Sequence, residues 1–340
     1  MSFFVAGAVV AGVSAVFCVL LFSPRAQSLI VFAQWLNWPP FSWAAPEAPS
    51  ASWAWPVSHL FGRLDWSFVA FRGLTGVKPF TAKGSMGTIR GWRIPRTGPG
   101  NRTVIYLHGN AGNVAVHHRV LLYQLLTAKP LACDVVVFDY AGFGKSDGWW
   151  PDEESCLADA LAVWKTLQAE DDDVILWGHS LGTGVAIDLI AALVGHRGPG
   201  VDALGGVHPV GSTPLLDVGG LPHGLILEAP FLSVPDVAAS FVGWLPRRFV
   251  RGLTSLLHGA LKTHKFPAVD RIGEVARHMQ NIAVLHGLRD NVVPHAQGKR
   301  IAEVAGVPLH SFDRKHDDIV SDPGLVEILE SLFETWDSRP

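Results

Sequence analysis

The chain has 340 residues, which is enough for one large globular domain and a further segment. Only 17% of the residues are charged and the mean hydropathy is +0.26, whereas ordinary soluble domains carry about 25% charged residues. The composition therefore predicts that part of the surface contacts lipid. A formal net charge of −3, without a dense basic run, argues against a nucleic acid partner.

The N-terminal stretch from Phe3 to Phe22 contains no charged residue. A helix rises about 1.5 Å per residue, so this stretch is long enough to cross a hydrocarbon core of about 30 Å. It lacks the basic start and the small-residue cleavage site of a secretory signal peptide. We therefore predict a single-pass transmembrane anchor over residues 1–27. Its orientation stays open, because Arg25 is the only basic side chain nearby.

Residues 28–80 form a membrane-proximal segment that is rich in tryptophan and proline. The prolines exclude a long helix, and tryptophan is enriched at membrane–water interfaces. The segment either seats the following domain on the bilayer or packs over that domain as a strap. Its tryptophans are Trp35, Trp38, Trp43, Trp53, Trp55 and Trp66.

From residue 81 to residue 340, short apolar runs alternate with helical segments. This alternation predicts an α/β catalytic domain with a mainly parallel sheet and helices on both faces. The earliest strand is a candidate for antiparallel pairing at one edge. We predict strands near 86–93, 103–108, 133–139, 173–178, 224–229, 281–287 and 307–313. We predict helices near 114–128, 152–169, 181–194, 295–304 and 323–336.

A loop of small residues follows the apolar run near 103–108. Acyl transfer needs N–H groups that are already in place to bind the developing oxyanion. A small-residue loop lets the backbone approach a reacting group. We predict the backbone amide of Asn110 as one such donor, and a plain strand-to-helix turn is the alternative.

The sequence Gly-His-Ser-Leu-Gly occupies residues 178–182, between a predicted strand and a predicted helix. In this context G-x-S-x-G is typical of a nucleophile elbow, in which a serine sits in a strained turn. The two glycines let strand and helix approach without Cβ clashes. The pattern predicts Ser180 as nucleophile and the amide of Leu181 as the second oxyanion donor. An ordinary glycine-rich turn is the alternative.

Two stretches interrupt the alternation of strands and helices. The Gly- and Pro-rich residues 195–224 have the character of an insertion. About fifty residues separate the next two strands, too many for a simple crossover. We expect a lid over residues 231–280. Apolar residues within it recur at helical spacing, with Arg247 and Arg251 on the other face. Three roles are open for such a helix: it lies on a membrane surface, it guides an anionic head group to the site, or it only covers the core.

A serine nucleophile needs a base and an acid that orients the base. Asp290 and His316 each follow a predicted strand, at the edge where open α/β sheets collect ligand-binding residues. The order Ser, Asp, His is also the order found with nucleophile elbows. We therefore predict the catalytic triad Ser180, Asp290 and His316.

Other acids and histidines are weaker candidates. Glu228 ends a predicted strand and is an alternative acid, whereas Asp139 precedes the serine and so has the wrong order. Asp317 and Asp318 are expected to cap the last helix or to lie in solvent. We expect His179, in the elbow, and His286, in a strand, to have packing roles. We expect His117 and His118 to lie at exposed positions on a helix.

These motifs, in this order, resemble the α/β-hydrolase superfamily, and in particular its membrane-anchored branch of monoacylglycerol and lysophosphatidylserine lipases. The likeness covers about residues 85–338 and rests on Leu107–Asn113, Phe138–Gly148 and Trp177–Ala186. It implies a Ser–Asp–His triad, an N-terminal transmembrane helix and lipid ester substrates. It also implies a location in the endoplasmic reticulum or another endomembrane. The stretch 195–224 departs from a compact family member.

We therefore expect a membrane-anchored serine hydrolase that cleaves monoacylglycerols or lysophospholipids through an acyl-enzyme. An acyl-protein thioesterase, a serine peptidase and a catalytically silent binding module of the same fold are the alternatives. The expected partners are a lipid substrate and the bilayer, and the oligomeric state stays open. No metal or cofactor is expected, because no ligand spacing joins Cys18, Cys133 and Cys156.

Overall fold

The computed structural model describes residues 23, 27, 74–167, 173–195, 220–241, 246–261 and 264–339. The predicted anchor at Phe3–Phe22 lies outside the described residues, as do most of the Trp/Pro-rich segment and most of the stretch 195–224. Of the helices in the described part of the chain, none is long and apolar enough to span a membrane.

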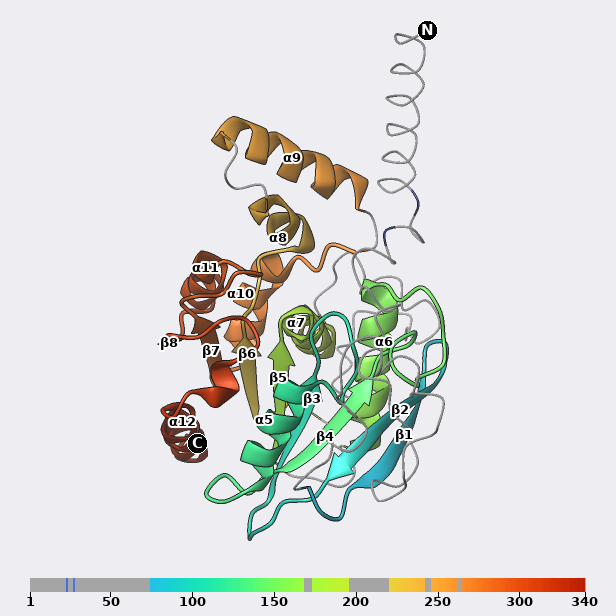
Figure 1. Cartoon of the computed structure of the whole chain (residues 1–340), viewed down its shortest axis with the longest axis vertical. Helices are drawn as coiled ribbons and strands as arrows, with labels where there is room; N and C mark the ends of the chain where they lie inside the picture. Colours follow the sequence, from blue (N-terminus) through green and yellow to red (C-terminus); the bar gives the residue numbers. More distant parts are fainter. Residues whose placement is uncertain are drawn as a thin grey trace, which may run out of the picture.

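Within the described residues, eight strands form one sheet in the order β1-β2-β4-β3-β5-β6-β7-β8 (Figure 1). All strand pairs from β4 to β8 are parallel, whereas β2 pairs antiparallel with both β1 and β4. The predicted α/β class with a mainly parallel sheet is confirmed. The strands are β1 (Lys78–Gly84), β2 (Gly87–Ile94), β3 (Arg102–Leu107), β4 (Asp134–Asp139), β5 (Asp173–His179), β6 (Gly224–Glu228), β7 (Ile282–Gly287) and β8 (Leu309–Phe312).

The first strand is the one that the sequence does not predict. β1 lies at the edge of the sheet, and Ala82 is its single buried residue. An exposed edge strand has no apolar alternation for a sequence pattern to detect. Because β1 begins at Lys78, the first strand of the sheet crosses the domain boundary expected at residue 81.

Helices cover both faces of the sheet because successive strand residues point to opposite sides. In β3, for example, Ile105 and Leu107 belong to one buried cluster, and Val104 and Tyr106 belong to the other. The first cluster contains residues of α6 (Glu153–Leu167), α7 (Leu181–Leu193), α10 (Ala268–His278) and α11 (His295–Ala305). The second contains residues of α5 (His117–Thr127) and α12 (Leu325–Asp337).

The connection between β6 and β7 contains α8 (Val234–Ser240), α9 (Arg247–Ala260) and α10. α8 and α9 lie beyond the carboxyl ends of the parallel strands (Figure 1). α10 differs, because its Ala268, Ile272 and Val275 are buried in the core beside α7 and α11. The expected lid segment 231–280 therefore includes one helix that covers the sheet itself.

A buried ion cluster holds the end of this connection in place. Nη1 of Arg271 on α10 lies 2.9 Å from Oε1 of Glu153 on α6, and it also bonds Asp188 on α7. Oε2 of Glu153 accepts the backbone N–H groups of Lys265 and Phe266 at 3.0 and 2.8 Å. Breaking a buried pair leaves an uncompensated charge, which is strongly destabilising. The cluster therefore ties the chain that follows α9 to two helices of the core.

Candidate active site

Ser180 occupies a strained turn between β5 and α7. Its φ is 51° and its ψ is −118°, a conformation that residues other than glycine rarely adopt. Its N–H donates to the carbonyl of Glu228 at 2.9 Å, and its own carbonyl accepts the N–H of Thr183 at 2.9 Å. The turn therefore presents the hydroxyl beyond the end of the strand, as a nucleophile elbow requires.

The two glycines of the G-x-S-x-G sequence are required by backbone contacts. A Cβ on Gly178 would lie 2.5 Å from the carbonyl oxygen of Gly182, and a Cβ on Gly182 would lie 1.9 Å from that of Leu107. Neither position can hold a larger residue without moving the backbone. The motif therefore needs glycine at both positions, because the backbones of β5, α7 and the end of β3 are in direct contact there.

Asp290 and His316 come from the loops after β7 and β8 and meet at the same edge of the sheet. Nδ1 of His316 donates to Oδ2 of Asp290 at 2.7 Å. Oδ1 of Asp290 accepts the backbone N–H groups of Val292 and Val293, each at 2.8 Å. Burial alone would raise the pKa of Asp290, but the hydrogen bonds from His286 and His316 outweigh burial and hold that pKa below its ordinary value. Asp290 is therefore a carboxylate.

The bond to Asp290 also settles which nitrogen of His316 carries the proton. A carboxylate accepts only, so Nδ1 is protonated and Nε2 presents a lone pair in the neutral ring. Burial lowers the pKa of His316, but the hydrogen bond and the charge of Asp290 outweigh it, and the pKa is raised. Ser180 and His316 line the same pocket.

The alternative acids have other partners. Oε2 of Glu228 accepts the indole N–H of Trp177 at 2.9 Å, and burial raises the pKa of Glu228 to about 7. Oδ1 of Asp139 accepts the backbone N–H of Val114 at 2.9 Å, within the core. The structure thus brings Asp290, and neither of these residues, into hydrogen-bond contact with His316.

Two histidines with expected packing roles hold parts of this site. Nε2 of His179 lies 3.1 Å from the carbonyl oxygen of His316. Nε2 of His286 lies 3.0 Å from the carbonyl oxygen of Val293 and 3.3 Å from Oδ2 of Asp290. Carbonyls and carboxylates accept only, so Nε2 is protonated in both rings. His286 is therefore a second donor to Asp290, a role that the sequence does not predict.

The two predicted oxyanion donors border Ser180. Asn110, in the loop after β3, lines a pocket together with Ser180 and Leu181. Leu181 is the first residue of α7, so its N–H has no partner within the helix. The positive end of the helix dipole favours negative charge at this point.

Arg119 on α5 orients the loop that carries Asn110. The guanidinium group is buried, and its Nη2 donates to the carbonyls of Gly109, Asn110 and Ala111 at 3.0, 3.3 and 3.0 Å. Its Nη1 donates to the carbonyl of Asn113 at 2.7 Å. In a trans peptide the C=O and the following N–H point in opposite directions. By binding the Gly109 carbonyl, Arg119 therefore directs the Asn110 N–H away from itself.

Two pockets meet at Ser180, and Asn110 and Val292 also line both. The first, here called the histidine pocket, has a volume of about 530 Å³ and is lined on its polar side by His118, His179, His316, Arg119 and Asp317. The second, here called the apolar pocket, has a volume of about 380 Å³. It is bounded by the side chains of Leu181, Phe231, Val234, Val237, Ala238, Phe241 and Val293.

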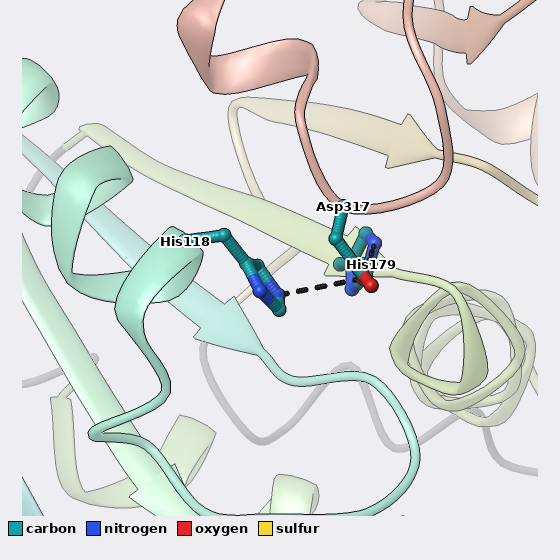
Figure 2. Close-up of side chains that lie close together, drawn as sticks. All are labelled: His118, His179 and Asp317. Carbon is teal, nitrogen blue, oxygen red and sulfur yellow. Dashed lines mark ion pairs between the residues drawn. The ribbon is translucent and has the colours of Figure 1, made fainter. Parts of the chain in front are cut away.

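His118 lies in the histidine pocket rather than on the surface. His117 is exposed, as expected for this helix, but the next side chain turns inward. Nε2 of His118 lies 3.6 Å from Oδ1 of Asp317, and Nε2 of His179 lies 3.7 Å from the same oxygen (Figure 2). Burial lowers the pKa of His118, so the ring is neutral. Asp317 lines the pocket and its side chain is exposed to solvent, as one of the two expectations had it, and it does not cap the last helix.

His118, His179 and Asp317 also form a possible metal-binding group. Of the described residues, these offer one ligand atom each, and the three atoms lie within 4.8 Å of one another. The sequence predicts no metal site. Because Nε2 of His179 donates its proton to the carbonyl of His316, that nitrogen has no lone pair for a metal. As arranged, the cluster supplies two ligands, His118 and Asp317, rather than three.

Comparison with protein families agrees with this geometry. A model described as the α/β hydrolase fold matches residues 102–192, which contain the Asn110 loop and the Ser180 turn. Among solved structures, an esterase of Pyrococcus furiosus superimposes with a TM-score of 0.54 over 81% of this chain and 95% of that chain. Its sequence identity is 16%, so this match shows the fold alone.

Several similar curated proteins are named lysophosphatidylserine lipase ABHD12. The chicken (Gallus gallus) protein is 31% identical over 268 residues, which cover 74% of this chain and 63% of that protein. The cattle (Bos taurus) protein is 30% identical over 267 residues, which cover 74% of this chain and 60% of that protein. The match thus spans less than two thirds of the relatives' length. The chain thus has the α/β-hydrolase fold, and its sequence is similar to those of the ABHD12 lipases.

Proposed function

We propose that this protein is a membrane-anchored serine hydrolase that cleaves carboxylic esters of lipids, either monoacylglycerols or lysophospholipids. The observation that carries the proposal is the position of Ser180 between an apolar pocket and a pocket lined by histidines. A lipid ester has the same division, with a hydrocarbon chain on one side of the carbonyl and a polar alcohol on the other. The lipase names of the relatives support this substrate class.

The proposed reaction is acyl transfer to water. Nε2 of His316 takes the proton of Ser180 as the hydroxyl attacks the ester carbonyl, and Asp290 stabilises the imidazolium that forms. The amides of Leu181 and Asn110 bind the oxyanion, and one such donor contributes about 3 kcal/mol in comparable enzymes. His316 then protonates the leaving alcohol. Water, activated by the same histidine, releases the fatty acid.

In this proposal each half of the substrate binds in one of the two pockets. Hydrocarbon is best placed in the apolar pocket, against Val234 and Val237 of α8. The alcohol then lies in the histidine pocket, where His118 and Asp317 offer hydrogen-bond partners. In this proposal α8 and α9 act as the lid. The apolar segment Phe3–Phe22 holds the protein in the endoplasmic reticulum or another endomembrane.

Fluorophosphonate labelling of the detergent-solubilised full chain tests the nucleophile. We expect labelling of the wild type, complete loss in Ser180→Ala, and a large loss in His316→Ala, because a serine without its base is a weak nucleophile. His117→Ala, an exposed neighbour on α5, is the matched control and should label normally. A folded but unlabelled wild type would favour the silent binding module. Labelled protein that cleaves thioesters or peptides but no lipid ester would favour those alternatives.

The pH dependence follows from the raised pKa of His316. A general base must be neutral, so the labelling rate should rise with pH through an apparent pKa above 6.5. In Asp290→Asn the imidazolium loses its partner, so this pKa should fall and the rate should drop by a factor on the order of 10⁴. Asp317→Asn removes a charge without removing the hydrogen bond, and should cause a smaller downward shift of the pKa. Equal shifts in the two variants would contradict the assignment of Asp290.

Arg119 should affect the rate through the oxyanion donor. In Arg119→Met the loop loses four hydrogen bonds, and we expect kcat to fall by about 10² to 10³, the cost of one oxyanion donor, with little change in KM. Arg119→Lys keeps the charge but not the forked geometry, so it should recover only part of the rate. The melting temperature of each variant serves as the folding control. A rise in KM with unchanged kcat would place Arg119 in substrate binding instead.

Val237→Trp should fill the apolar pocket. Hydrolysis of long-chain monoacylglycerol should fall by at least about tenfold, whereas hydrolysis of an acetyl ester should persist, because only the longer chain needs the filled volume. Ser240→Trp places the same ring on α8 outside the pocket and is the control. If Val237→Trp slows both esters equally, the acyl chain lies elsewhere.

A further inference from the structure

The large hydrophobic side chains that are exposed gather at one end of the molecule. Single exposed apolar residues are normal on a soluble surface, but a concentration on one face marks a binding surface. In the described chain these residues are Met86, Trp149, Trp150, Phe241, Phe249, Leu256 and Leu288. Trp149 is the most exposed, at 81%.

The topology places every one of them beyond the carboxyl ends of the parallel strands. Trp149 and Trp150 lie between β4 and α6, and Leu288 directly follows β7. Met86 lies in the β1–β2 turn, which is at the same end because β1 and β4 are both antiparallel to β2. The remaining three belong to the β6–β7 connection. This is the end of the sheet that carries Ser180.

α9 has the composition of a helix that lies in a membrane interface. Phe249 and Leu256 are about half exposed, and a Cβ on Gly252 between them would meet no atom within 4 Å. Arg248 and Arg251 are exposed on the same helix. The helix contains no Asp or Glu. Exposed apolar side chains together with exposed basic ones on a single helix suit a bilayer that contains anionic lipid.

The path of the chain joins this surface to the predicted anchor. The side chain of Gln27 is buried, and its Nε2 donates to the carbonyl of Ala260, the last residue of α9, at 3.2 Å. Gln27 follows the uncharged segment Phe3–Phe22 by only five residues. A bilayer that holds this segment therefore lies next to the C-terminal end of α9.

The apolar pocket reaches the same surface. Phe241 is 60% exposed and also lines the apolar pocket with Ser180 and Val237. Its ring thus borders both the surface and the pocket. Phe241 therefore marks the side on which the apolar pocket lies closest to this surface.

We infer that the end of the molecule formed by α9, the Trp149–Trp150 loop and the β1–β2 turn docks onto the lipid bilayer. Phe249 and Leu256 enter the interface, Arg248 and Arg251 contact anionic head groups, and Trp149 forms a second contact. The substrate chain passes Phe241 to reach Ser180. This inference rests on the proposed lipid substrate, and it names the surface through which that substrate arrives.

Spin labelling tests the docking independently of catalysis. The full chain with Cys18→Ser is reconstituted in vesicles of phosphatidylcholine and phosphatidylserine, with one nitroxide at Trp149→Cys, Phe249→Cys or Glu334→Cys. Glu334 is exposed on α12, whose end pairs with the amino end of β3, so it is the control site. We expect the labels at 149 and 249 to be relaxed by oxygen, as in lipid, and the label at 334 by a water-soluble nickel complex. Nickel relaxation at all three sites would overturn the inference.

Activity measurements provide a second test. For Phe249→Ser/Leu256→Ser we expect at least a fivefold loss of turnover on monoacylglycerol in vesicles and unchanged turnover on a soluble short-chain ester. Arg248→Ser/Arg251→Ser should lose the response to added phosphatidylserine, whereas Arg277→Ser/Arg300→Ser, with the same change of charge on α10 and α11, should keep it. Undiminished turnover on vesicles would overturn the inference. A chain that docks by spin labelling but cleaves no ester would instead refute the proposed function.

Discussion

The strained turn at Ser180 is the constraint on which the rest of the site depends. Its positive φ costs about 1–3 kcal/mol, and the surrounding backbone compensates for this cost. The N–H of Ser180 bonds the carbonyl of Glu228, while Gly178 and Gly182 allow β5, α7 and β3 to lie in direct backbone contact. These contacts fix the backbone of Ser180 at the end of β5. The other parallel strands end at the same edge of the sheet, so the loops that follow them lie next to Ser180.

Buried polar groups then hold each of those loops. Arg119 binds four carbonyls of the Asn110 loop, and Asp290 takes two backbone N–H groups of its own loop and a contact from His286. His179 binds the backbone of His316. None of these bonds involves the Ser180 hydroxyl, yet in the proposed mechanism each one reduces the reorganisation that the reaction would otherwise require. The low-dielectric surroundings that strengthen these bonds also make any unpaired group in them costly.

How much the sequence predicts depends on whether a residue has a local signal. The strands from β2 to β8 are predicted because they are apolar runs in a buried sheet, whereas the exposed edge strand β1 has no such pattern. Asp290 and His316 are predicted as site residues because they follow strands in the expected order. Arg119 and His118 have no local signal, because a basic residue on a helix is ordinarily solvated. The burial of Arg119 and the inward position of His118 result from the packing of α5 against the Asn110 loop and the loop after β8.

The sequence by itself determined the class of the fold, the turn at Ser180 and the residues that could accompany it, because apolar periodicity, glycine spacing and chain order are local properties. Only the tertiary structure decided that Asp290 rather than Glu228 meets His316, and that an apolar pocket and a histidine pocket adjoin at Ser180. It also decided that the exposed hydrophobic residues share one end with the site. The physical reason is that strands distant in the chain end at a common edge, and only their order in the sheet brings their loops together.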